Sequence, residues 1–373
     1  MTERTSKPEP GGAPLPPPSI GGESVTSTDG FDLEHEAPHY PSAEIVGSSQ
    51  PLAVGLTEGP PVVGAGLVGA GGKSRVGDRV FSGLTTGSAG FIILLVVLIA
   101  TFLLIKAVPS ILDDKDNFFT STNWSPEAGN LHFGIASLLW VTVIISIVAM
   151  VIAVPIAVAV ALFITQYAPR RIARPVAYIL DLLAAIPSIV YGVWGAFTLT
   201  TALEPVQRVL SHIPIPIFNL EHATGTIFDG AVVLAVMVLP IITAISRDVF
   251  ERTPRANIEA ALALGATKWE MIRIAVLPYG RAGVVSGSML GLGRALGETI
   301  AVYLIVSTVS PPFKFSIFTG GSTFASQIAN GAAEFNNPQS TGAYIAAGLV
   351  LFVLTFVVNS AARAIVNRKK DFV

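Results

Sequence analysis

Residues 259–265 read EAALALG, and residues 277–278 read LP. This stretch lies between two long apolar segments, in a connection that carries six Lys and Arg residues. Glutamate and alanine favour helix, and glycine supplies the permissive backbone that often ends one. We therefore expect a short helix that ends at Gly265 and lies outside the membrane, next to its surface.

The flanking residues define this segment further. Thr253 and Pro254 predict an N-cap hydroxyl and a proline at the first helical position. Residues 267–270, TKWE, have the pattern of a capping box that begins a second helix. We expect two short helices joined at a glycine elbow over about residues 254–270. The alternative is an ordinary amphipathic connector on the membrane surface, because short capped helices are common.

Composition indicates a membrane protein. Mean hydropathy is +0.64, and 51% of the residues are hydrophobic whereas 13% are charged, more apolar than a typical soluble domain. The chain has no cysteine, and its five histidines are scattered without metal-ligand spacing. A Gly-rich run at residues 64–69 lacks the strand and helix that a nucleotide-binding loop needs. We therefore expect no metal site, no cofactor and no catalytic residues.

The chain divides by charge near residue 72. Residues 1–72 contain two basic and nine acidic residues, are rich in Pro, Gly and Ser, and lack an apolar period. Such a segment buries too little surface to offset its ordering entropy, so we expect a disordered cytoplasmic tail. Residues 73–373 contain 21 basic and 16 acidic residues and form the predicted transmembrane domain.

Long uncharged or weakly charged runs predict an all-α membrane protein. The predicted spans cover about residues 80–105, 134–167, 175–199, 228–246, 282–308 and 342–362. Connections rich in Lys and Arg alternate with connections that are poor in them. By the positive-inside rule this pattern places both termini in the cytoplasm of a multi-pass protein of the cell (inner or plasma) membrane.

Two ionisable residues fall inside the fifth predicted span, where residues 291–298 read GLGRALGE. Arg294 follows Arg281 by thirteen residues, about 20 Å along a helix, so it should lie within the bilayer. Glu298 should lie one turn further on the same face. Guanidinium suits a tetrahedral oxyanion, and Glu298 would orient it. The alternative is a permanent structural ion pair.

Glycines recur in the same span. Positions 283, 287 and 291 repeat at four-residue spacing, as do positions 293 and 297. Small residues in such stripes allow close helix packing in membranes. We therefore expect the fifth span to lie centrally.

The third predicted span contains DLLAAIPSIVYGVWG at residues 181–195. Pro187 and the two glycines interrupt helical hydrogen bonding, which a membrane tolerates only beside protein or a cavity. Ser188 and Tyr191 are therefore candidate pathway groups. A kinked packing helix is the competing interpretation.

Together, the runs at 181–195, 259–265 and 294–298 resemble the permease subunits of the phosphate-specific ABC importer, and specifically the PstC type. The similarity covers about residues 76–366. It implies six transmembrane helices of the ABC importer permease (type I) kind.

The resemblance also implies roles for individual residues. The segment around Glu259, Ala260, Ala261 and Gly265 would dock on a separate ATPase. Arg294 and Glu298 match residues that matter for phosphate transport in that family.

The same resemblance implies partners. These are two ATPase subunits, a second homologous permease, an extracytoplasmic phosphate-binding protein, phosphate and membrane lipid, with no nucleic acid. ATP hydrolysis would belong to a partner chain, so this chain would not be an enzyme. A pathway arginine alone does not separate phosphate from sulfate or molybdate. A stand-alone secondary transporter is a third reading; it predicts inverted repeats, which the sequence does not display.

Overall fold

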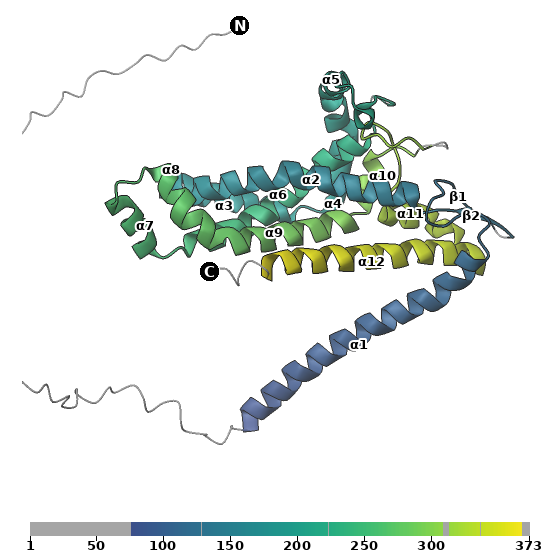
Figure 1. Cartoon of the computed structure of the whole chain (residues 1–373), viewed down its shortest axis with the longest axis horizontal. Coiled ribbons are helices and arrows are strands. Elements are labelled where there is room, and N and C mark those ends of the chain that lie inside the picture. The colour runs from purple at the N-terminus through teal and green to yellow at the C-terminus, as the bar shows by residue number, and fades with distance from the viewer. Residues whose placement is uncertain (1–75, 128, 223, 309–312, 336, 368–373) are drawn as a thin grey trace, which may run out of the picture. The chain divides into compact units, whose positions relative to one another are not determined.

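The structure is a computed structural model, and it describes residues 76–367 except 128, 223, 309–312 and 336. The tail predicted over residues 1–72 lies outside the described part. Helices dominate the described residues (Figure 1). In chain order, the α-helices are α1 (Val76–Leu112), α2 (Ala136–Leu162), α3 (Arg170–Ala185), α4 (Ser188–Trp194), α5 (Thr200–Leu210), α6 (Ile227–Glu251), α7 (Arg255–Ala263), α8 (Lys268–Met271), α9 (Leu277–Gly297), α10 (Ile300–Ile305), α11 (Phe324–Asn330) and α12 (Pro338–Asn367).

Shorter elements join or extend these helices. The π-helical turns are η1 (Phe163–Tyr167), η2 (Gly195–Leu199) and η4 (Ile272–Val276), and the 3-10 turns are η3 (Pro216–Phe218) and η5 (Gly331–Glu334). Strands β1 (Trp124–Glu127) and β2 (Asn130–Phe133) pair antiparallel in a hairpin. The backbone of Gly129 turns between them with φ +79°, a conformation that glycine adopts readily.

Four helices in the described part are long and apolar enough to cross a membrane. They are Gly77–Leu112, Ala136–Tyr167, Ile227–Glu251 and Pro338–Ala364. Each overlaps a predicted span: the first, second, fourth and sixth. The membrane character predicted from the apolar runs is therefore confirmed.

The third predicted span is broken. Helices 170–185 and 188–210 meet at an angle of 92°. Ile186 has an extended backbone (ψ 130°), because the ring of Pro187 disfavours helical geometry in the residue before it. Counted as one, this bent pair makes a fifth candidate span.

The fifth predicted span does not run on to residue 308 as one helix. Helix α9 ends at Gly297, Glu298 is extended, and α10 begins at Ile300. Helix α9 is not among the four helices that qualify by length and apolarity. The described helices are compatible with six crossings, and the count of six stays a prediction.

The core lies where α2, α6 and α9 pack together. Helix α2 buries Ile145, Ala149, Ala153 and Ala157 completely, at four-residue spacing. The three alanines of this stripe are small enough to allow α6 to approach closely. Helix α6 contributes larger buried residues to the same cluster, among them Leu234, Val238 and Ile242.

Glycines bring α9 against α6. A Cβ at Gly283 would lie 2.2 Å from Val249 Cγ2, and one at Gly291 would lie 2.9 Å from Ile242 Cδ1. Real side chains do not approach as closely as at Gly283, so this packing requires glycine there, whereas at Gly291 the end of the Ile242 side chain would have to shift. The prediction that the fifth span lies centrally is therefore confirmed for the face that carries Gly283 and Gly291. Gly293 has open space around its Cβ position and belongs to a different face.

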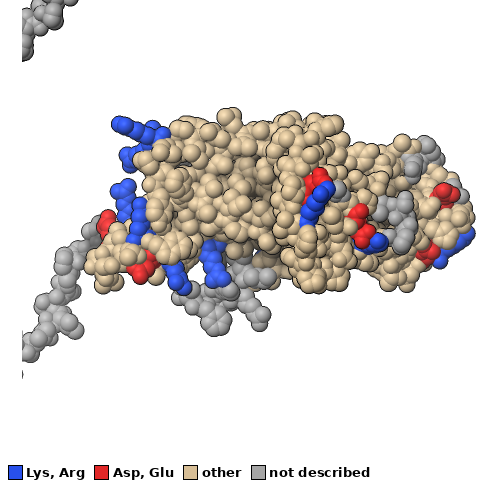
Figure 2. Space-filling view, turned by 90° about the horizontal axis from the view of Figure 1, so that it is seen from above, with Lys and Arg blue, Asp and Glu red and all other residues tan. Residues whose placement is uncertain are grey.

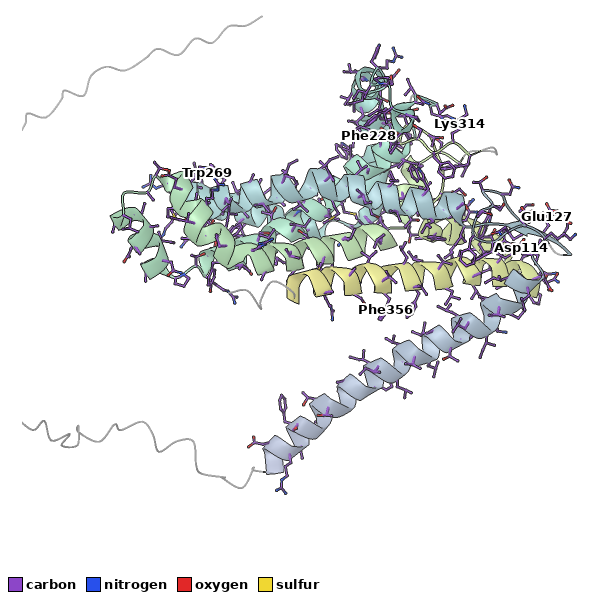
Figure 3. The ribbon with its side chains drawn as sticks, viewed as in Figure 1. Asp114, Glu127, Phe228, Trp269, Lys314 and Phe356 are labelled. Carbon is purple, nitrogen blue, oxygen red and sulfur yellow. The ribbon has the colours of Figure 1, made fainter. Side chains whose placement is uncertain are left out.

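The hairpin and the short helices α7 and α8 lie at opposite ends of the helical bundle. Figure 3 shows Asp114 and Glu127 at the hairpin end and Trp269 at the end of α7 and α8. At the hairpin end, α1 packs on α12, where Ser110 Oγ donates a hydrogen bond to the backbone carbonyl of Gln339 at 3.0 Å. Figure 2 shows Lys and Arg side chains gathered at the end that carries α7 and α8.

Candidate functional site

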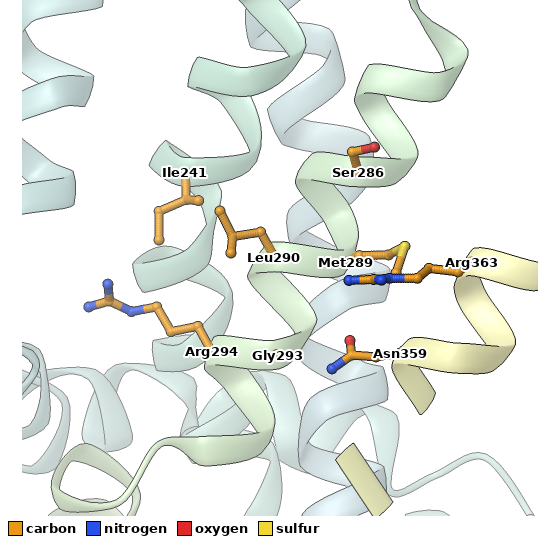
Figure 4. Close-up of a pocket in the computed structure, with 8 residues that line it drawn as sticks. All are labelled: Ile241, Ser286, Met289, Leu290, Gly293, Arg294, Asn359 and Arg363. Atoms are coloured by element: carbon orange, nitrogen blue, oxygen red, sulfur yellow. The ribbon is translucent and has the colours of Figure 1, made fainter. Parts of the chain in front are cut away.

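Arg294 lies on a cavity of about 840 Å³ between three helices. Figure 4 shows the residues that line it, from α6 (Ile241), from α9 (Ser286, Met289, Leu290, Gly293 and Arg294) and from α12 (Asn359 and Arg363). The open Cβ position of Gly293 is explained by this hollow. The arginine predicted for the pathway therefore does reach a cavity.

In the part of the chain that the structure describes, the guanidinium of Arg294 has no acidic partner. Among the described residues it forms no ion pair and no hydrogen bond. An unpaired charge in an apolar setting is costly, so this group is suited to an incoming anion.

Glu298 is not placed as the helical spacing predicts. Because α9 ends at Gly297, Glu298 (φ −68°, ψ 127°) does not continue the helical face that carries Arg294. Its side chain is buried, and Oε1 accepts a hydrogen bond from the backbone N–H of Ala301 at 3.3 Å. The expectation of one face shared with Arg294 is corrected by this break, and the carboxylate supports the first turn of α10 instead.

Tyr191 and Glu298 come from elements that pack together. Helix α4 lies against α10, where a Cβ at Gly192 would lie 2.9 Å from Ala301 Cα. Tyr191 is buried, and its hydroxyl donates to the backbone carbonyl of Leu183 at 2.9 Å. Ser188 is half-buried at the start of α4. Of the four predicted pathway residues, Arg294 lines the cavity, whereas Ser188, Tyr191 and Glu298 do not.

The predicted two-helix elbow is present. Gly265 follows α7 with φ +82°, the left-handed conformation that glycine adopts without strain. Thr267 then begins α8 with a reciprocal capping box: its Oγ1 accepts from the Glu270 N–H, and its own N–H donates to Glu270 Oε2 at 2.8 Å. Both features follow the prediction.

The start of α7 differs by one residue from the prediction. Pro254 is the N-cap residue, and Arg255 is the first helical residue. Thr253 makes no capping hydrogen bond; its hydroxyl is buried without a partner among the described residues. The extended backbone of Pro254 (ψ 129°) excludes it from the helix.

The predicted coupling residues divide between the surface and the interior. Glu259, Ala260 and Gly265 are exposed. Ala261 is buried against a cluster that includes Phe250 and Met271. Ala261 therefore attaches the elbow to the helical body, while the other three residues remain open to a partner.

Several surface and cavity residues were not predicted. On the elbow, Leu264 is 89% exposed and Trp269 is 57% exposed. The apolar Leu264 directly before Gly265 was the sequence signal that could have indicated this exposed surface. Asn359 and Arg363 line the cavity from α12. Their spacing of four residues at the end of an apolar run could have indicated a shared helical face.

Comparison with known proteins places these features in context. Residues 153–371 match the family described as "Binding-protein-dependent transport system inner membrane component". The chain is 52% identical over 303 residues to "Phosphate transport system permease protein PstC 2" of Mycobacterium tuberculosis, covering 79% of this chain and 94% of that protein. It is 50% identical over 273 residues to "Phosphate transport system permease protein PstC" of Mycobacterium leprae, covering 71% and 86% respectively.

Solved structures also overlap the chain, and one of them covers most of it. It is described as "Crystal structure of a bacterial ABC transporter involved in the import of the acidic polysaccharide alginate". It covers 78% of this chain and 99% of the solved chain, at 16% identity and a TM-score of 0.49.

Proposed function

The chain belongs to the family of binding-protein-dependent transport system inner membrane components, and we propose that it is the permease subunit of an ATP-driven phosphate importer. As a membrane transport subunit, it is not an enzyme in its own right. Phosphate is the proposed cargo because relatives at 50–52% identity carry the name of phosphate transport permeases. The observation that best supports an anion pathway is the position of Arg294. Its guanidinium lines a cavity of about 840 Å³ and has no acidic partner in the described part.

Arg294 is suited to bind a phosphate oxyanion. Guanidinium presents planar paired donors that match two oxygens of a tetrahedral anion. Hydrogen bonds to charged groups contribute about 1.5–3 kcal/mol each, enough to attract an anion that has lost part of its water. The cost of the unpaired arginine within the membrane is offset when the anion arrives.

Glu298, Tyr191 and Ser188 have supporting roles in this proposal. Glu298 follows the end of α9 at Gly297 and supports the first turn of α10, and its role would be to fix the end of the helix that carries Arg294. Tyr191 ties α4 to the end of α3 through the Leu183 carbonyl. Ser188 supplies a hydroxyl at the break between α3 and α4. Movement of these broken elements would alter access to Arg294.

The elbow is the proposed contact with the ATPase. Glu259, Ala260 and Gly265 are exposed there, and Leu264 and Trp269 add apolar surface. Exposed apolar side chains rimmed by polar residues are typical of protein interfaces. The full proposal comprises two ATPase subunits, a second homologous permease and an extracytoplasmic phosphate-binding protein.

Charge supports an orientation in the membrane. Lys and Arg gather at the end with α7 and α8 (Figure 2), which the positive-inside rule assigns to the cytoplasm. With six crossings, both termini would then be cytoplasmic and the hairpin extracytoplasmic. A thiol probe in the hairpin turn, reactive from outside intact cells, would test this orientation; reactivity only after permeabilisation would contradict it.

Reconstitution tests the function itself. The complete complex, purified with its native partners into liposomes, should accumulate radiolabelled phosphate only when ATP and the binding protein are present. This chain reconstituted alone should not transport. If the complex takes up sulfate or molybdate in preference to phosphate, phosphate is not its cargo. If the chain transports phosphate alone, the proposed ATPase is not required.

A further inference from the structure

Two residues of α12 line the cavity that holds Arg294. Asn359 and Arg363 lie four residues apart, so they share one face of the helix. Figure 4 shows the Arg363 side chain extending from α12 toward Met289 of α9, with Asn359 one turn away. Arg294 points from α9 to another side of the cavity in the same view. The two guanidinium groups therefore belong to separate parts of one space.

Among the described residues, the lining carries two positive charges and no carboxylate. Arg363 forms no ion pair within the described residues, and the Asn359 side chain makes no hydrogen bond there. Ser286, across from them, donates its hydroxyl to the backbone carbonyl of Ala282 at 2.8 Å. The donors of Arg363 and Asn359 are therefore available to an anion.

The direction of Arg363 distinguishes this group from an ordinary interfacial arginine. Arg363 lies four residues before Asn367, where α12 ends. An arginine near the end of a span usually extends past that end to reach water and lipid headgroups. Here the side chain crosses toward α9 instead (Figure 4), and so it adds charge to the cavity.

The two arginines also lie at different depths. Met289, beside Arg363 in Figure 4, precedes Arg294 by five residues, which is about 7.5 Å along α9. The backbone of Arg363, near the C-terminal end of α12, therefore lies closer than the backbone of Arg294 to the end of the bundle with α7 and α8 (Figure 1). In the proposed orientation that end is cytoplasmic.

We propose that Arg363 and Asn359 form a second anion station, which receives the transported phosphate after Arg294 and releases it toward the cytoplasm. The inference rests on the proposed function. Guanidinium and amide groups supply several donors to phosphate oxygens. Conduction through a pathway benefits from several moderate sites, because an anion must bind well enough to enter and weakly enough to leave.

Cysteine chemistry offers a direct test, because the chain has no cysteine of its own. The complete complex carrying Asn359→Cys is placed in nanodiscs of phosphatidylcholine, and labelling by a small thiol reagent is followed by the mass of this chain. Inorganic phosphate at about ten times its dissociation constant should slow labelling about tenfold, because about nine-tenths of the sites are then occupied. Adding Arg363→Gln should remove the protection, and adding Arg363→Lys should retain part of it.

Arg281 provides the matched control. It is exposed on α9 and is not part of the cavity lining, so phosphate should not protect Arg281→Cys. If phosphate does not slow the labelling of Asn359→Cys, the proposed second station is wrong. It is also wrong if phosphate still protects the cysteine when Arg363→Gln is added. If anionic lipid protects the cysteine without added phosphate, the site binds a lipid headgroup. That result also contradicts the proposed phosphate station.

Uptake by the unmodified complex separates this inference from the proposed function. If the complex imports phosphate and Asn359→Cys shows no protection, the second station fails while the function stands. If the unmodified complex imports no phosphate, the function itself fails. Arg363→Gln should lower uptake about tenfold through the loss of a charge-assisted hydrogen bond, whereas Arg281→Gln should leave it unchanged.

Discussion

The carboxylate of Glu298 accepts a hydrogen bond from the backbone N–H of Ala301, with 3.3 Å between Oε1 and N. Glu298 is extended and Ala301 lies in the first turn of α10, so the contact spans the break after α9. Ala301 also packs against Gly192 of α4. The carboxylate thereby helps to hold α10 against α4 and leaves the charge of Arg294 unopposed.

This contact gives Glu298→Gln and Glu298→Ala different expected effects. Glutamine keeps an acceptor oxygen, so Glu298→Gln should retain the turn and most of the uptake. Glu298→Ala removes the acceptor and should lower the stability of the complex by about 1 kcal/mol, with a matching fall in uptake. Thermal unfolding of the purified complex measures the first effect. Equal damage by both variants would mean that the charge, not the hydrogen bond, is what matters.

Gly283 and Gly293 form a matched pair on α9. A Cβ at Gly283 would lie 2.2 Å from Val249 Cγ2 and 2.7 Å from its Cβ, so Gly283→Ala should destabilise the chain by about 1–3 kcal/mol through overpacking. Gly293 has open space, and Gly293→Ala should be neutral or stabilise by up to about 1 kcal/mol through helix propensity. Thermal unfolding of both variants measures these two effects. A stable Gly283→Ala protein would contradict the close α6–α9 packing.

Gly265 should tolerate asparagine but resist valine. Its φ of +82° is costly for a β-branched residue, whereas asparagine visits this region more readily. No neighbouring atom lies within 4 Å of its Cβ position, so side-chain volume is not the obstacle. Gly265→Val should leave the chain in the membrane yet reduce both uptake and transport-linked ATP hydrolysis. Full transport by Gly265→Val would identify the elbow as a plain surface loop.

The elbow was predictable because its signals are local. Gly265 and the Thr267 capping box depend on residues within one turn, and both appear where the sequence places them. The exception is Thr253: the extended backbone of Pro254 starts the helix one residue later. Such a shift depends on small differences in backbone geometry.

The cavity was only partly predictable because its walls come from distant segments. Arg294 was found through its charge inside an apolar run. The end of α9 at Gly297 was missed, because the run stays apolar past it and the packing of α10 on α4 decides where the helix stops. Arg363 directly follows the sixth predicted span, residues 342–362, and only the pairing of α12 with α9 brings it to the cavity.

The hairpin should lose stability in acid through Asp116. A hydrogen bond with His132, 3.0 Å from Nδ1 to Oδ1, is the largest factor that lowers the pKa of Asp116 below its usual 3.8, and Ser121 and Asn123 assist. A lowered folded-state pKa stabilises the protein above pH 3.8, and that contribution disappears as the pH falls through the folded-state value. Thermal unfolding is measured from neutral pH down through pH 3.8. At neutral pH, Asp116→Asn should be less stable than the unmodified protein.

The difference between these two proteins should shrink as the pH falls below 3.8. His132→Gln serves as the control, because it removes the histidine and retains a hydrogen-bonding side chain. A stability difference that stays constant with pH would show that the Asp116 carboxylate is not the group responsible.

The central claim is that Arg294 supplies the charge that meets phosphate within the membrane. The decisive measurement is ATP-dependent phosphate uptake by the reconstituted complex with Arg294→Gln, Arg294→Lys and the double variant Arg294→Gln, Glu298→Gln, alongside Arg281→Gln as the charge control. Uptake should fall at least about tenfold in every variant that lacks Arg294, since each loses a charge-assisted contact, while the complex remains assembled. Arg294→Lys should recover little, because ammonium lacks the planar paired donors. Uptake at the unmodified rate by the double variant would contradict the claim and leave Arg294 a structural residue.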